Sequence, residues 1–419
     1  MTTAQIDWFI NEYTADRLPD YQAAALLMAI YLRGMSRRET VDLTLAMAHS
    51  GDVLDVHGDV DFAIDKHSSG GVGDKTTLIV LPIVVACGVP VGKMSGRGLG
   101  FSGGTLDKME SIPGWRAELT TEEFLRQLRR HGIVLCGQSA NLAPADRKLY
   151  GLRDVTATVS ALPLIAASIM SKKLAGGADG VVLDVKVGRG AFMPTVERAV
   201  ELARLMVQLG EDAGKRMVAL ISDMNQPLGR MVGNALEVKE AIEVLRADGA
   251  PDLRAHCLAM AAHMLVLAGA APDLVNARDM CQARLADGSA WDKFCLLVRV
   301  QGGDVRSVEK PTLLPTARLV QPVPSPHAGF IAAVHADKVG MASMALGAGR
   351  ERKQDQVDHA VGVEVLVKVG DAVKVGAPLF AVHANDPERL VPAHEQLLSA
   401  VRWSDAPVKP LPLHYDVIT

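Results

Sequence analysis

Short, mostly apolar runs rich in valine and isoleucine alternate with glycine-rich turns and helical patterns, and this alternation constrains the fold most strongly. Such runs are typical of strands that are buried on both faces of a parallel sheet. Amphipathic helical patterns, including residues 121–131 and 195–209, lie between them. The sequence therefore predicts an α/β fold with a mainly parallel sheet. The expected strands span residues 62–64, 89–94, 133–135, 181–185 and 218–221.

Helical patterns also occur in two segments outside this alternation, residues 6–50 and residues 145–176. In the first of them, Ser36 and Glu39 have the spacing of a capping box, which favours the start of a helix. We expect the two segments to pack together as one small helical domain, although they lie far apart in the sequence.

The C-terminal region has a third character, which begins with three prolines between residues 322 and 326. Beyond them, valine-rich strands alternate with glycines, which is typical of a β-rich subdomain. Residues 324–329 and 369–373 are similar to the two halves of a biotinyl- or lipoyl-type barrel-sandwich. Lys338 precedes the second half, whereas the modified lysine of such carriers follows it, so we expect a structural barrel. The predicted domains are residues 1–50 and 145–176 (helical), 51–144 and 177–321 (α/β), and 322–419 (β-rich).

The charge balance excludes some classes of partner. The 419 residues include 44 lysines and arginines against 48 aspartates and glutamates, a net charge of −4. This balance gives no field that would attract nucleic acid or anionic lipid, so we expect neither as a partner. No apolar run approaches the ~20 residues that a membrane helix needs. The N-terminus lacks the pattern of a signal peptide, so we expect a cytoplasmic protein.

The cysteines have neither an even number nor a Cys-x-x-Cys pair, which disfavours a disulfide framework and a zinc knuckle. We expect buried thiols at Cys87, Cys136, Cys257, Cys281 and Cys295.

The first glycine-rich segment, residues 65–77, follows an expected strand and has the composition of a phosphate-binding loop. Its glycines allow backbone N–H groups to approach an anion, Ser68 and Thr77 offer hydroxyl groups, and Lys66 adds a positive charge. The Gly-Lys-Ser/Thr ending of a Walker loop is absent. A tight turn with solvated side chains is the alternative.

The second glycine-rich segment, residues 93–110, follows another expected strand. Residues 98–103 form a Gly-x-Gly-x-x-Gly pattern, which alone is also compatible with a dinucleotide-binding fold. The segment also carries Lys93, Ser95 and Thr105, and the first loop precedes it by less than one βαβ unit. We therefore favour two loops that close on one phosphate.

Polar residues also interrupt an apolar helical segment at residues 165–173. Ser168 and Lys172 are four residues apart, so a helix presents the hydroxyl and the ammonium on one face, where both can contact a small polar ligand. Arg153 is a further polar residue in the helical pattern before them. A buried serine beside a solvent-facing lysine is the alternative.

At these residues the sequence resembles the thymidine and pyrimidine-nucleoside phosphorylases, nearly from end to end. The resemblance implies a homodimer whose active cleft lies between the helical and the α/β domain and closes on both substrates. The stretches that carry it are Lys66-His67-Ser68, Ser95-Gly96-Arg97-Gly98-Leu99, Gly103-Gly104-Thr105-Leu106-Asp107, Gly137-Gln138-Ser139, and residues 142–146, 152–158, 184–188 and 233–238.

The implied reaction is reversible phosphorolysis, in which phosphate attacks C1′ of a pyrimidine nucleoside with inversion and yields free base and α-(deoxy)ribose 1-phosphate. Inorganic phosphate is then the co-substrate, and no organic cofactor is implied. His67 is the implied donor of a proton or hydrogen bond to the departing base. The residues implied to bind the base are Arg153, Ser168 and Lys172, and those implied to bind phosphate are Lys66, Ser68, Thr77, Lys93, Met94, Ser95 and Thr105.

Some positions differ from the pattern of the family, and one of them bears on which nucleosides the protein accepts. Lys93 accompanies family members that accept uridine as well as thymidine or deoxyuridine, so we expect broad pyrimidine specificity; a strict thymidine phosphorylase is the alternative. Phe101 and Ser102 stand where family members commonly have histidine and threonine, so the second loop is expected to contact its ligand differently.

Lys75 stands where close relatives have threonine beside a potassium site. The other residues that match this site are Gly73, Leu228, Met231 and Glu240. We expect the Lys75 ammonium to pair with Glu240 and partly replace potassium.

Two remoter alternatives belong to other functional classes. An enzyme similar to anthranilate phosphoribosyltransferase would need pyrophosphate and magnesium. The two loops offer no obvious pair of carboxylates for that metal, although Asp74 and Asp107 keep this alternative open. An inactive binding or signalling homologue is disfavoured by the intact Lys66, His67 and Arg153, together with Ser168 and Lys172.

Overall fold

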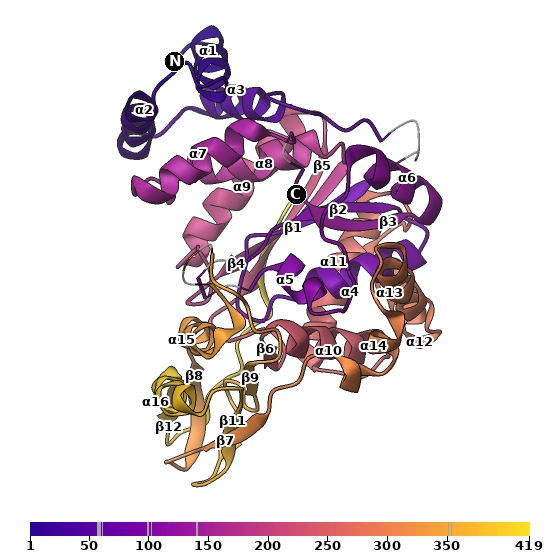
Figure 1. Ribbon diagram of the computed structural model, residues 1–419, viewed down its shortest axis with the longest axis vertical. Coiled ribbons are helices and arrows are strands. Elements are labelled where there is room, and N and C mark those ends of the chain that lie inside the picture. The colour runs from indigo at the N-terminus through magenta and orange to yellow at the C-terminus, as the bar shows by residue number, and fades with distance from the viewer. Residues whose placement is uncertain are drawn as a thin grey trace.

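The computed structural model comprises a helical part, a central α/β part and a β-rich C-terminal part, arranged in this order along its longest axis (Figure 1). This arrangement confirms the expected fold class. Leu99 and Ser102, which the sequence analysis used, lie outside the described residues. The structure describes residues 1–56, 60, 62–98, 100–101, 103–139, 141–350, 352 and 354–419.

The helical part combines helices from two separate segments of the chain. Thr2 and Ser36 cap the first and third helices through capping boxes, and prolines stand in the first turns of the last two. Apolar residues of both segments, among them Ile10, Leu43 and Leu164, share one core. The helices are α1 (Thr3–Thr14), α2 (Asp20–Arg33), α3 (Arg37–Ala48), α7 (Pro144–Val155) and α8 (Leu162–Ala175).

The central sheet has the strand order β13-β5-β4-β1-β2-β3 and is parallel except for its edge strand β13. Every residue of β4 is buried, as its apolar sequence predicts for a strand that is covered on both faces. The expected strands occur with shifted ends, whereas β13 was expected in the C-terminal unit. The strands are β1 (Ile64–Ser68), β2 (Val91–Ser95), β3 (Ile133–Gly137), β4 (Gly180–Val187), β5 (Arg216–Asp223) and β13 (His414–Ile418).

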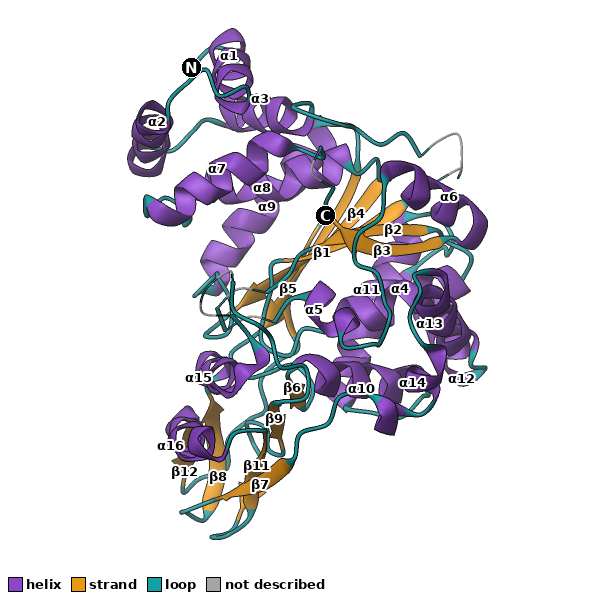
Figure 2. Cartoon of the chain, viewed as in Figure 1, coloured by secondary structure: helices purple, strands orange, loops and turns teal. Residues whose placement is uncertain are grey.

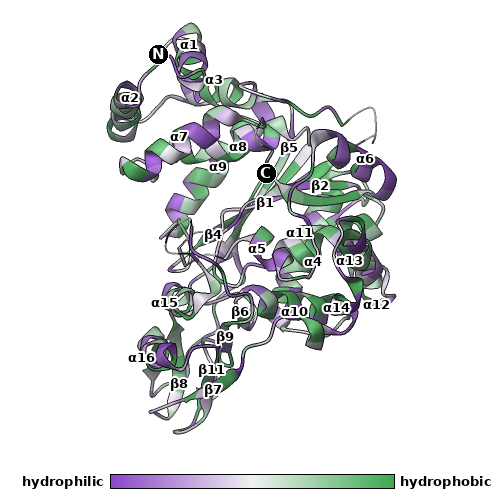
Figure 3. Cartoon of the chain, viewed as in Figure 1, coloured by the Kyte–Doolittle hydropathy of each residue, from purple (hydrophilic) through white to green (hydrophobic). Residues whose placement is uncertain are grey.

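Helices cover both faces of this sheet. Val181 and Leu183 of β4 pack in one core with α8 and α9, whereas Val182 packs in another core with α4, α10 and α11. Figure 3 shows the mostly hydrophobic colour of α4 inside the protein and the mixed colours of α6 at its edge. The helices are α4 (Thr76–Ala86), α5 (Thr105–Glu110), α6 (Thr121–His131), α9 (Val196–Asp212), α10 (Asn234–Leu245), α11 (Pro251–Leu267), α12 (Leu274–Ala286), α13 (Ser289–Val300) and α14 (Val305–Glu309).

The C-terminal part contains two small sheets, with strand orders β10-β8-β12 and β6-β9-β11-β7, which lie apart from the central sheet (Figure 2). Strand pairing crosses the predicted boundary at residue 322 in both directions, because β6 joins a small sheet and β13 joins the central sheet. The residue limits of the domains stay predictions. The elements are β6 (Met231–Val232), β7 (Leu319–Pro324), β8 (Gly329–Val334), α15 (Ala336–Ser343), β9 (Gly362–Val365), β10 (Ala372–Val373), β11 (Pro378–Ala384), α16 (Leu390–Ala400) and β12 (Val401–Ser404).

Lys338 and the cysteines have structural surroundings. Lys338 lies within α15, and its Nζ donates to the Ser399 carbonyl at 2.9 Å. All five cysteines lie within the described residues as free thiols; Cys87 is half-buried and the others are buried. Among the described residues, the helices are too short or too polar to cross a lipid bilayer.

Candidate active site

A cavity of about 290 Å³ lies where β1 and β2 end and faces α8 of the helical part. Ligands of open α/β sheets bind at the carboxyl ends of the strands, because the loops that follow parallel strands meet there. Both glycine-rich segments contribute to the wall, as do Gln138 and Leu142 after β3. Residues from distant parts of the chain therefore surround one cavity.

Most of the expected site residues line this cavity. On the side of the sheet these are His67, Ser68, Thr77, Lys93, Met94, Ser95 and Thr105, and on the side of α8 it is Lys172. Lys172 Nζ lies 3.1 Å from Ser168 Oγ, so the expected i, i+4 pair is present. The fold thus brings most of the residues expected to bind phosphate to one cavity with Lys172, whereas Ser168 is not part of the cavity wall.

Lys66 does not line the cavity. Its side chain is fully buried, its ammonium donates to Thr76 Oγ1, and Nζ lies 3.8 Å from Asp184 Oδ2. Adjacent residues in a strand point to opposite faces, so Lys66 lies behind the wall that His67 forms. The expected contact between Lys66 and phosphate stays a prediction, because the ammonium does not reach the cavity wall.

Arg153 is also absent from the cavity wall. Its guanidinium is buried and donates to the carbonyl of Val159 at 2.7 Å and of Leu164 at 3.0 Å. These bonds join α7 to the turn before α8 and to the first turn of α8. A contact between Arg153 and a base requires a movement that brings the buried guanidinium to the cavity.

Two glycines are required by the close approach of the loops. A Cβ at Gly104 would lie 2.0 Å from the Gly98 nitrogen, so a side chain there cannot be accommodated. Asp107 then holds this second loop, because its carboxylate accepts from the Gly98 N–H at 2.6 Å and contacts Arg350 at 2.7 Å. Gly73 has φ of +74°, and a Cβ there would lie 2.6 Å from the Leu228 carbonyl.

Lysines dominate the electrostatics of the cavity. Lys173 Nζ donates to Asp65 Oδ2 at 2.6 Å, whereas Lys93 Nζ lies 3.9 Å from the other oxygen of Asp65. Burial and the positive charge of Lys173 lower the pKa of Lys93 to about 7. Lys172 pairs with Asp146. A bound anion would relieve the repulsion among these ammonium groups.

His67 is a neutral imidazole in this environment. Burial and the charges of Lys173 and Lys93 hold its pKa well below the ordinary value. Nε2 is buried and has no hydrogen-bond partner among the described residues. A buried polar atom without a partner is costly, so Nε2 is available to a ligand. The geometry therefore favours a hydrogen bond from a neutral ring over proton donation by a charged one.

Asp74, Lys173 and Gln138 also line the cavity, and the sequence analysis did not assign them to the site. The Asp74 carboxylate accepts from the hydroxyl of Ser68 and, at 2.6 Å, from that of Thr76. Burial alone would raise the pKa of Asp74, but nearby lysines outweigh it and lower the pKa. The signal for Asp74 was its position inside the first glycine loop, and the signal for Lys173 was its place next to Lys172.

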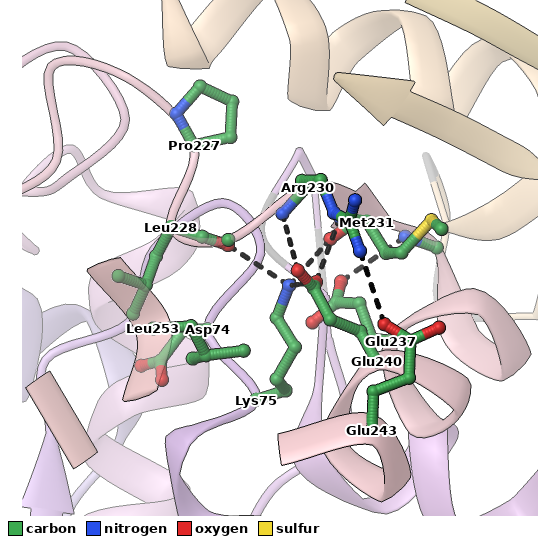
Figure 4. Close-up of polar contacts among 12 residues, drawn as sticks. Asp74, Lys75, Pro227, Leu228, Arg230, Met231, Glu237, Glu240, Glu243 and Leu253 are labelled. Carbon is green, nitrogen blue, oxygen red and sulfur yellow. Dashed lines mark hydrogen bonds and ion pairs between the residues drawn. The ribbon is translucent and has the colours of Figure 1, made fainter. Parts of the chain in front are cut away.

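Phe101 and the expected potassium ligands lie outside this cavity. Phe101 packs on the main hydrophobic core. Leu228, Met231 and Glu240 surround the ammonium of Lys75 next to the first loop, so a lysine side chain occupies the place expected for the ion (Figure 4).

Three family models match the chain in the order of its parts. The helical bundle domain of the glycosyl transferase family matches residues 1–51, and the a/b domain of that family matches residues 60–291. A pyrimidine nucleoside phosphorylase C-terminal domain matches residues 330–404.

Curated relatives are similar over nearly the whole chain. A pyrimidine-nucleoside phosphorylase of Geobacillus stearothermophilus is 48% identical over 419 residues, which cover 100% of this chain and 96% of the relative. One of Bacillus subtilis (strain 168) is 51% identical over 385 residues, covering 92% of this chain and 89% of the relative. One of Staphylococcus aureus (strain MSSA476) is 45% identical over 420 residues, which cover 100% of this chain and 96% of the relative.

A solved structure shares the fold. The crystal structure of anthranilate phosphoribosyltransferase from Thermus thermophilus matches with a TM-score of 0.59 and 20% identity. The match covers 72% of this chain and 96% of that one. At this identity the likeness concerns the fold alone.

Proposed function

Because this chain belongs to the glycosyl transferase family and groups there with the pyrimidine-nucleoside phosphorylases, we propose that it catalyses the reversible phosphorolysis of pyrimidine nucleosides. The observation that carries this proposal is one cavity lined by both glycine loops and by Lys172 of the helical part. A site for an anion and a polar site for a base meet there.

In the proposed reaction, a phosphate oxygen forms a bond to C1′ while the bond from C1′ to the pyrimidine nitrogen breaks. The electron pair of the broken bond leaves with the base, and the sugar leaves as α-(deoxy)ribose 1-phosphate. Thr77, Ser95 and Thr105 donate hydrogen bonds to phosphate, Ser68 does so only in place of its hydrogen bond to Asp74, and Lys93 supplies positive charge. Holding both substrates in one cavity lowers the barrier through orientation, by several kcal/mol as an order of magnitude.

The base must depart as an anion, so the site has to accept negative charge. We assign this role to Lys172, with Ser168 beside it, and to His67. Phosphate brings negative charge close to His67 and offsets the lysines that lower its pKa, so His67 becomes a better proton donor when phosphate is bound. Arg153 reaches the base only after a rearrangement of the turn before α8. Lys66 lies outside the cavity wall and positions the first glycine loop through its hydrogen bond to Thr76.

We also propose broad pyrimidine specificity, on the basis of Lys93 in the cavity wall, and a homodimer. The helical part exposes Trp8, Tyr21 and Leu32 on α1 and α2, which supports a second copy as its partner.

The alternative, an enzyme that uses pyrophosphate and magnesium, is disfavoured by the state of the two carboxylates in the loops. Asp107 pairs with Arg350, and Asp74 accepts from Ser68 and Thr76. In each carboxylate both oxygens already accept hydrogen bonds, so neither presents two free oxygens to a metal ion.

An ultraviolet assay of base release tests the proposal. We expect free thymine and free uracil from thymidine and uridine when phosphate is present and magnesium and pyrophosphate are absent. Release of thymine alone would favour strict thymidine specificity. No release from either nucleoside, or release only with pyrophosphate and magnesium, would refute the proposed activity.

A further inference from the structure

Lys75 places a positive charge in a closed cage of oxygen atoms. It immediately precedes α4, and its side chain is fully buried. Its Nζ donates to the carbonyl of Leu228 at 3.0 Å, to that of Met231 at 2.8 Å and to Glu240 Oε2 at 2.5 Å (Figure 4). An ammonium group has three N–H donors, so each has an acceptor here.

The cage is set by the backbone and not by Lys75 alone. Glu240 accepts from the N–H groups of Arg230 at 2.6 Å and Met231 at 2.9 Å, which fixes its carboxylate. A Cβ at Gly229 would lie 2.6 Å from Glu240 Oε1, so the turn of residues 228–231 needs glycine to approach the carboxylate.

The charge of the cage suits a monovalent cation. Two carbonyl oxygens and one carboxylate carry a single negative charge in a buried place, which one ammonium neutralises. The Lys75 ammonium supplies the positive charge at contact distance, since it donates to the Glu240 carboxylate and to both carbonyls.

We propose that Lys75 is a built-in cation that takes the place of a bound monovalent metal ion and fixes the first glycine loop against the turn of residues 228–231. Leu228, Met231 and Glu240, three of the residues that the family resemblance assigns to potassium, surround a side chain instead. This inference rests on the proposed function only where the loop is said to bind phosphate.

The position of Lys75 in the chain links this cage to the active site. Asp74 on one side of it and Thr77 on the other both line the cavity. Fixing Nζ therefore limits the motion of both side chains and of the N-terminus of α4. Lys75 acts as a positioning residue and does not itself touch the substrates.

Lys368 offers an internal comparison at the same turn. Its Nζ donates to the carbonyls of Pro227 and Gly229, each at 2.6 Å, and contacts Asp252 at 2.9 Å. The Lys368 side chain is 24% exposed, whereas that of Lys75 is fully buried. If Lys368 is removed, water can take over the hydrogen bonds of its ammonium. If Lys75 is removed, water cannot neutralise the buried charge of Glu240.

The test compares Lys75→Ala, Lys75→Met and the wild type in chlorides of potassium, sodium and tetramethylammonium at equal ionic strength. Phosphorolysis and the thermal unfolding temperature are read in parallel. We expect the wild-type rate to be the same in the three salts within about twofold, since its cage is already filled. Lys75→Ala leaves an open cage, and we expect its rate to fall roughly tenfold or more in tetramethylammonium and to recover severalfold in potassium.

Lys75→Met is the matched control, because its apolar side chain fills the space and leaves no room for an ion. We expect the same loss in all three salts for this variant. We expect Lys368→Ala to lose less activity than Lys75→Ala, because solvent reaches the Lys368 site.

Strong activation of the wild type by potassium over sodium would overturn the proposal. It would also be overturned if folded Lys75→Ala showed no response to any of the three cations, or if potassium rescued Lys75→Met equally. If Lys75→Ala does not fold in tetramethylammonium, the test compares its refolding yield in potassium with that in tetramethylammonium, followed by circular dichroism. A higher yield in potassium would show that the ion fills the cage. A wild type without phosphorolysis would refute the proposed function, while the unfolding temperatures would still test the cage.

Discussion

Phosphate binding should be coupled to protonation of Lys93. In the free protein the pKa of Lys93 is about 7, because the side chain is buried and faces Lys173. At pH 8 only about one tenth of such a group is protonated. A phosphate dianion in the cavity favours the ammonium form, so binding must draw a proton from solution.

The magnitude follows from Coulomb's law for a phosphate that touches the Lys93 ammonium. At about 4 Å and an effective dielectric constant of about 20, each unit of charge contributes roughly 4 kcal/mol, enough to raise the Lys93 pKa above about 9. We therefore expect uptake of about 0.9 proton per site at pH 8. The Kd for phosphate should rise by up to about tenfold per pH unit above 8, where phosphate itself is almost wholly dianionic.

Calorimetric titration of phosphate at pH 8, in two buffers with different ionisation enthalpies, measures this proton uptake. Lys93→Met should abolish most of it, and Lys310→Met, at an exposed position in the α/β part, should leave it unchanged. Equal uptake by Lys93→Met and the wild type, or none in either, would show that Lys93 does not titrate as the structure indicates.

Three further perturbations test other parts of the molecule. His67→Ala should lower kcat roughly a hundredfold, with a smaller change in KM for the nucleoside, because Nε2 has no other partner among the described residues; steady-state kinetics decides, and an unchanged kcat would contradict the assigned role. Arg153→Ala should lower the unfolding free energy by roughly 3 kcal/mol in urea titrations, because buried carbonyls lose their donor; equal stability of Arg153→Ala and Arg153→Lys to the wild type would argue against this. His414 Nε2 lies 2.9 Å from His256 Nδ1, and burial lowers the pKa of His414 to about 4. Between about pH 6.5 and 4 the unfolded chain therefore binds more protons at this residue than the folded protein does, so the unfolding free energy falls as the pH falls through this window. His414→Gln should flatten that slope in urea unfolding at pH 7 and pH 5, and an unaltered slope would exclude His414 as a source.

Sequence reasoning was most successful where a structure depends on neighbouring residues. The helix expected at residues 121–131 has those bounds, because Thr120 and Glu123 form its capping box and Gly132 ends it in a left-handed conformation. The Ser168–Lys172 pair followed from the helical repeat alone. The positions of the glycine loops after strands likewise placed most of the cavity wall.

Other assignments depended on residues far away in the sequence. The direction of Lys66 could have been inferred, since strand neighbours alternate between faces, but its partner Asp184 could not. The last strand was expected in the C-terminal unit, and it pairs instead with β5 in the central sheet. Arg153 is held by carbonyls whose positions only the packing of α7 against α8 sets.

The amino-acid sequence by itself determined the strands, the helices, their caps and the loops with glycine, because these features arise from side chains within a few residues of one another. The pairing of Lys75 with Glu240 was expected from the family resemblance. Tertiary structure alone decided the protonation of Lys93 and His67 and the complete burial of Lys75. Burial removes water and brings distant charges together, and neither the dielectric surroundings nor the neighbours of a charge can be read from its place in the chain.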